Sequence, residues 1–105
     1  MSIQYKEIQG KRVSNAGSVD LISNRQQFKA NSMAGVYFNE GDYLPTGRLD
    51  TTLVALLTSH KPDFIVYSYG TPIAWHHAGG WEIPAVRYSV TTSKHQGIVR
   101  RAVWS

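Results

Sequence analysis

The sequence predicts a small α+β domain: an antiparallel sheet of three to five strands with two helices packed on it, near residues 50–60 and 93–104. The stretch 64–90 alternates β-branched and aromatic runs with Gly-containing breaks, a pattern typical of consecutive antiparallel strands. A helix-like segment precedes this stretch and another follows it, so the sheet is the natural surface for both. A chain of 105 residues is large enough to form one hydrophobic core that folds without disulfides or a structural metal.

The composition limits which kinds of protein and of chemical site the chain can form. Cysteine is absent, which excludes disulfides, thiolate zinc sites and cysteine nucleophiles. The sequence contains no membrane-length apolar run and no signal segment, so we expect a cytoplasmic protein without membrane contact. The net charge of +4 is uneven: residues 1–30 and 83–105 are basic, whereas residues 31–63 carry four acids against two bases. Basic ends are compatible with an acidic partner, although a charge of this size is also ordinary for solubility.

The N-terminal part is the least regular. Residues 1–27 combine few apolar positions with turn-forming residues, which predicts an N-terminal arm or edge segment beside a single domain at 28–105. A first strand ends near Phe38, before a polar break. The helix near 50–60 has clear boundaries, because Asp50 is a suitable N-cap and Pro62 disfavours helical backbone at the residue before it.

The strands of the central stretch differ in their surroundings. Residues 64–69 are apolar or aromatic on both faces, which indicates a central strand covered on both sides. A second strand covers 73–76. A third, 81–90, contains Pro84, which cannot donate to a ladder and therefore predicts an edge or a bulge.

The last helix is predicted from its apolar stripe. Ser93 and Gln96 match a capping box that would start the helix. His95 lies near the middle of the stripe. On the wheel, the apolar stripe is formed by Ile98, Val99, Ala102 and Val103, and the opposite arc by Lys94, Gln96, Gly97, Arg100 and Arg101.

Two segments carry a family resemblance. The residues YSYGTPIAW at 67–75 and TTSKHQ at 91–96, with Trp81, Pro84 and Tyr88, resemble a family of small proteins of unknown function. Such proteins are encoded by actinobacterial phages, mycobacteriophages in particular, and by some bacterial genomes. The resemblance covers roughly residues 28–103 and implies a phage or mobile-element protein in a bacterial cytoplasm. It implies no activity, and no functional residue follows from it.

Two kinds of binding surface are compatible with the residues. A nucleic-acid or anion surface needs mobile cations and hydroxyls on one face. A protein surface needs aromatic anchors, although the same aromatics could fill a small core. The nucleic-acid or anion candidates are Arg87, Ser93, Lys94, His95, Arg100 and Arg101. The protein-surface candidates are Tyr69, Trp75, Trp81 and Tyr88.

Catalytic and metal centres have less support. Adjacent His76 and His77 on a strand point to opposite faces, and no metal-binding motif surrounds them or His60. No nucleophile-elbow motif accompanies the serines. We therefore expect no cofactor and no metal, and we favour a non-enzymatic binding module for a host or phage protein. The alternative is a nucleic-acid-binding protein, for DNA or RNA, that uses the basic face of the last helix.

Overall fold

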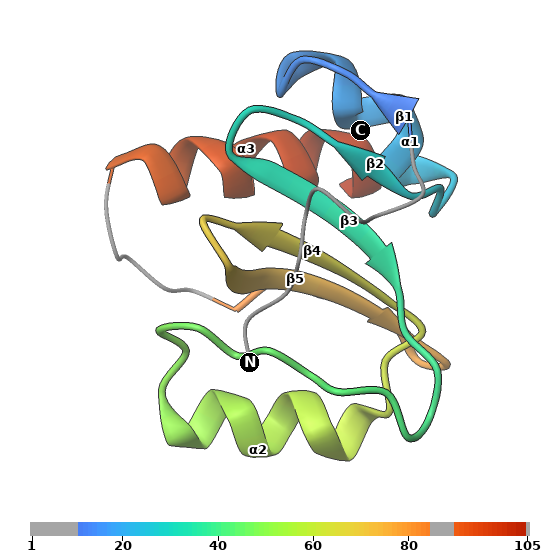
Figure 1. Cartoon of the computed structure of the whole chain (residues 1–105), viewed down its shortest axis with the longest axis vertical. Helices are drawn as coiled ribbons and strands as arrows, with labels where there is room; N and C mark the ends of the chain where they lie inside the picture. The colour runs from blue at the N-terminus through green and yellow to red at the C-terminus, as the bar shows by residue number, and fades with distance from the viewer. Residues whose placement is uncertain (1–10, 85–89, 105) are drawn as a thin grey trace.

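The computed structural model describes residues 11–84 and 90–104, which form three layers. A six-stranded sheet lies in the middle, with α1 and α3 on one side and α2 on the other (Figure 1). The strands are β1 (Lys11–Arg12), β2 (Phe28–Lys29), β3 (Met33–Tyr37), β4 (Phe64–Ser68), β5 (Thr71–His77) and β6 (Gly80–Glu82). The helices are η2 (Ala16–Ser18, a 3-10 turn), α1 (Val19–Ser23), α2 (Thr51–His60) and α3 (Val90–Trp104).

The sheet is a meander in which neighbours in sequence are neighbours in space. Its order is β1-β2-β3-β4-β5-β6, and β2 to β6 pair antiparallel. The two-residue β1 adds a parallel edge to β2. The predicted α+β class with an antiparallel sheet is confirmed. The parallel strand β1, the 3-10 turn η2 and the helix α1 are additions to the predicted three to five strands and two helices.

Strand β4 divides the core in two, as the apolar pattern on both of its faces predicts. Phe64 and Val66 join one buried cluster, which Ile22 of α1 and Val99 of α3 complete. Ile65 joins a second cluster under α2 with five other side chains. The register between β4 and β5 shifts at Val66/Tyr67, a bulge that leaves Ile73 beside Ala74 in the first cluster.

Helix α2 begins and ends where the sequence predicts. The Asp50 carboxylate accepts the N–H of Leu53 at 2.9 Å, which satisfies one of the free donors of the first turn. Helical backbone stops at His60, and Lys61 adopts the left-handed conformation (φ 51) before Pro62. Leu49 and Val54, the expected staple across the cap, pack in the same cluster.

The structure shows how residues 11–27, predicted as an arm or edge segment, join the domain. This segment belongs to the domain: Ile22 is fully buried in the first cluster, and α1 packs against α3. Val13 N–H also donates to Lys29 O at 3.0 Å. The low apolar density hid this role because a single fully buried side chain anchors the short helix.

The start of the last helix also differs from the prediction. α3 begins at Val90, so Ser93 lies inside the helix and is not its cap. Gln96 is buried and donates to Ile73 O at 3.2 Å and Pro84 O at 2.8 Å. Its amide therefore satisfies carbonyls of the sheet edge instead of closing a capping box, and it lies on the buried side of the helix.

Candidate functional site

One surface of α3 combines cations with an exposed aromatic ring. Lys94 and Arg101 are seven residues apart, two helical turns, and so share a face. Gly97 lies between them, and Trp104, a residue that is 65% exposed, lies one turn beyond Arg101. Ser93 borders the same face. These five residues, all exposed, are called here the basic face of α3; Arg100 is half-buried beside it.

The fold brings the two basic ends of the chain to the same side of the sheet. Because α1 packs on α3, residues 11–29 and 90–104 lie together, as Figure 1 shows. These two segments carry seven Lys or Arg and one acid, Asp20. Residues 38–63, which include α2, carry four acids and two bases. The described chain is therefore polarised across the sheet.

The predicted protein-surface residues separate in the structure. Trp75 is fully buried in the cluster under α2, so its prediction as a surface anchor is wrong. Trp81 is half-buried and packs edge-on against Phe64 and His76. Tyr69 is exposed at the β4–β5 turn. The fourth, Tyr88, lies outside the described residues, as does Arg87 of the predicted nucleic-acid surface.

Tyr69 occupies an unusual backbone conformation. Its φ of 50 lies in the left-handed region, which is a genuine outlier for a bulky residue. The N–H of Tyr69 donates to Ser32 O at 2.9 Å, and its ring stacks on His95 with centroids 6.0 Å apart. These contacts hold the strained turn, and Tyr69 remains 66% exposed.

His95 is the centre of a buried polar network and does not reach the basic face. Its Nδ1 lies 2.7 Å from Ser68 Oγ, and its Nε2 lies 3.1 Å from Ser32 Oγ and 3.2 Å from Asn15 Nδ2. His95 is 3% exposed, and burial lowers the pKa of its ring. The network links α3 to β4 and to the segments before α1 and β3.

The Ser68–His95 pair has the hydrogen-bond distance of a nucleophile and its base. Both side chains are buried, so a substrate has no access to them in this arrangement. The described cavity, lined by residues between Phe38 and Pro62, contains neither His95 nor His76. The pair is therefore interpreted as part of the core.

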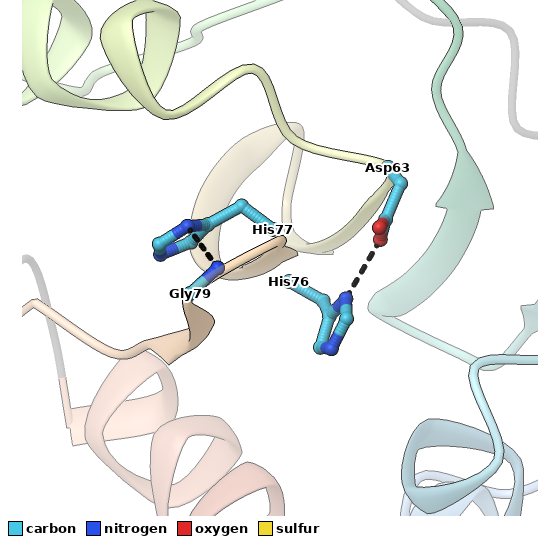
Figure 2. A network of polar contacts seen from close by, with 4 residues as sticks. All are labelled: Asp63, His76, His77 and Gly79. Carbon is cyan, nitrogen blue, oxygen red and sulfur yellow. Dashed lines mark hydrogen bonds and ion pairs between the residues drawn. The ribbon is translucent and has the colours of Figure 1, made fainter.

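A second histidine cluster lies on the α2 side, at the ends of β5 and α2. Trp75 Nε1–H donates to His60 Nδ1 at 3.0 Å, and the rings of His60 and His77 stack at 4.0 Å. The Gly79 N–H donates to His77 Nδ1 at 3.1 Å (Figure 2). Burial first, and then the neighbouring His60, lower the pKa of His77.

His76 turns away from His77, as alternation along a strand predicts. Figure 2 shows its ring directed toward the Asp63 carboxylate, with His76 Nδ1 2.8 Å from Asp63 Oδ1. The two adjacent histidines thus belong to different contacts. Sequence spacing gave no signal for Asp63 or for Glu82, which antiparallel pairing brings to the histidines.

The geometry of the cluster argues against a shared metal ion. One ligand atom from each of His60, His77 and Glu82 lies within 4.8 Å of the others. The two rings, however, are nearly parallel, with 14° between their planes. Lone pairs in stacked planes do not converge on a point about 2.0–2.1 Å from each nitrogen. Both Nδ1 atoms also accept N–H bonds, whereas a metal-bound histidine donates its other N–H.

Comparison with known proteins places the chain in one family. A family model described as "Family of unknown function (DUF8033)" matches residues 7–99. No curated protein and no solved structure matches the chain. Among the residues that the structure describes, no helix is long and apolar enough to cross a membrane.

Proposed function

The chain belongs to this family of unknown function (DUF8033), and we propose that it is a non-enzymatic binding module of phage type whose partner is single-stranded nucleic acid. It acts in the cytoplasm of a bacterial host, the setting that the resemblance to phage proteins implies. The observation that carries the proposal is the basic face of α3, where Lys94, Arg101 and Trp104 share one side of a helix.

The chemistry of this face suits an unpaired strand. Exposed lysine and arginine side chains bind phosphates through charge, and the salt dependence of binding reports their number. The exposed indole of Trp104 offers a flat surface on which a base stacks whatever its sequence. Cations without aromatic rings would bind duplexes equally well, so Trp104 favours single strands.

Gly97 supports a close approach to the same face. A Cβ at Gly97 would meet no atom within 4 Å, so packing inside the domain does not require glycine there. Glycine in an exposed helix costs about 1 kcal/mol relative to alanine. A bound backbone lying against the helix between Lys94 and Arg101 gives this glycine a reason.

The test is binding of fluorescently labelled single- and double-stranded DNA and RNA, measured by anisotropy at low and moderate salt. Wild-type protein should prefer single strands, and its affinity should fall as salt rises. Trp104→Ala should lose about 1–3 kcal/mol of binding free energy. Arg101→Glu should weaken binding and lower the salt slope by about 0.7 or more.

Lys61→Glu is the matched control, because it makes the same change in charge at an exposed position on the α2 side. At protein concentrations at which both variants are monomeric, it should bind nearly as wild type does. Equal losses of affinity in Arg101→Glu and Lys61→Glu would show that binding depends on net charge alone and not on the basic face of α3. Absence of binding at low salt would exclude this function.

A protein partner, the leading prediction from the sequence, is a second candidate, favoured by Tyr69. Tyrosine is a frequent interface anchor, and strained backbone concentrates at functional sites. Tyr69→Asn keeps a residue that tolerates the left-handed backbone and removes the ring. Capture of a host or phage protein by wild type, lost in a folded Tyr69→Asn variant, would support this candidate; equal capture by both would oppose it.

A further inference from the structure

A cavity lies on the side of the sheet opposite α3. It encloses about 450 Å³ between the loop after β3 and the end of α2. Phe38, Leu44 and Pro62 give it apolar walls. Glu40 and Asp42 stand at the same cavity, and both are exposed. A pocket of this size has room for one large side chain.

The potential in this cavity favours a cation. The residues that line it include two carboxylates, Glu40 and Asp42, and one ammonium group, that of Lys61. Thr58 of the last turn of α2 also lines the cavity, and the negative end of the helix dipole lies there, although the Thr58 carbonyl itself accepts the N–H of Lys61 at 3.2 Å. The turn that holds Asp42 is fixed, since the Asn39 N–H donates to Asp42 Oδ2 at 2.9 Å. The site therefore combines apolar walls with a preformed acidic rim.

The matching shape and charge lie on the other side of the same molecule. The basic face of α3 presents Arg101 one turn from the exposed indole of Trp104. Indole and guanidinium groups are the side chains most enriched at the energetic centres of interfaces. An apolar pocket with acidic edges would bury the indole and pair the guanidinium group.

We propose that the Glu40–Asp42 pocket of one copy receives Arg101 and Trp104 of a second copy. The pocket is lined by residues of the loop after β3 and the end of α2, and Figure 1 shows α2 and α3 on opposite sides of the sheet, so one chain cannot satisfy both surfaces itself. The contact joins different surfaces and is heterologous, which produces chains of molecules or rings instead of a closed symmetric pair. This inference does not rest on nucleic-acid binding and goes beyond it.

Sedimentation velocity over a concentration series tests the contact. Wild type should shift from monomer to larger species as concentration rises, and high salt should reverse the shift. Glu40→Lys and Arg101→Glu should each sediment as monomers. Lys61→Glu, which removes the opposing cation from the pocket, should strengthen association, although its charge change equals that of Arg101→Glu.

The sharpest test mixes the two charge-reversal variants. Glu40→Lys and Arg101→Glu chains should associate with each other, because each reversed surface meets its complement, and the double variant should associate with itself. Circular dichroism checks that these surface variants fold. A wild type that stays monomeric, or a mixture that does not associate, would overturn the proposal.

The two proposals fail separately. Glu40→Lys leaves the basic face of α3 intact, so it should bind oligonucleotides at least as tightly as wild type. Loss of oligonucleotide binding in a folded, monomeric Glu40→Lys variant would show that the basic face of α3 does not carry the binding by itself. Normal oligonucleotide binding by a wild type that never self-associates would overturn the self-association alone.

Discussion

The two sides of the sheet are built from different parts of the chain and have different surfaces. The α3 side joins residues 11–29 to residues 90–104 and is rich in Lys and Arg, with Trp104 exposed. The α2 side comes from one continuous middle segment, which is acidic and encloses the cavity. Packing of α1 on α3 converts a charge pattern along the sequence into a polarity across the molecule.

The largest expected difference in stability is between two tryptophans, one buried on the α2 side and one exposed on the α3 side. Trp75 is fully buried under α2, so Trp75→Ala should lower the free energy of unfolding by about 3–5 kcal/mol. Trp104→Ala on the α3 side should change it by no more than about 0.5 kcal/mol. Urea unfolding followed by circular dichroism measures both. Similar losses would contradict the assignment of Trp75 to the core and Trp104 to the surface.

Acid should lower the free energy of unfolding, and the histidine on the α3 side should contribute more to this loss than the histidine on the α2 side. The pKa of His95 is lowered in the folded protein, so below about pH 6.5 the unfolded chain binds more protons. Stability is then complete above about pH 6.5 and falls as pH drops, by up to about 1.4 kcal/mol per pH unit for one histidine.

Urea titrations at about pH 7.5 and pH 5.5 measure this loss. His95→Gln should flatten the pH dependence clearly. His77→Gln should flatten it less, because the His77 ring is partly open to solvent and Glu82 and Asp63 oppose the lowering of its pKa. A greater effect at His77 would contradict the central role of the buried network.

The smallest effect concerns Gly97. Gly97→Ala should raise the free energy of unfolding by up to about 1 kcal/mol, since the new methyl group meets open space and alanine favours the helix. If the glycine serves a bound backbone, the same variant should weaken oligonucleotide binding. A variant that is more stable and binds equally well would leave Gly97 without a role in binding.

Sequence signals were sufficient where the cause is local. Asp50 and Pro62 set the ends of α2 through one carboxylate and one steric restriction, and both act within a few residues. The apolar pattern of β4 predicted a central strand because alternation reports two covered faces directly.

The errors have long-range causes. Gln96 matched a capping box, yet its amide donates to the carbonyls of Ile73 and Pro84. These acceptors are 23 and 12 residues away in the sequence, beyond the range of a local motif. Trp75 has the composition of an interface anchor, and only the position of α2 over β5 shows that it is core. The pairing of Ser68 with His95 joins residues 27 apart in sequence, for which a single sequence offers no signal.

The most direct test of the polarised molecule is an NMR titration of nitrogen-15-labelled protein with a short single-stranded oligonucleotide. The account predicts shift changes at the amides of Lys94, Gly97 and Arg101 and at the indole N–H of Trp104, with the amides of α2 nearly unchanged. Shift changes centred on α2 and the cavity, with α3 unaffected, would contradict it.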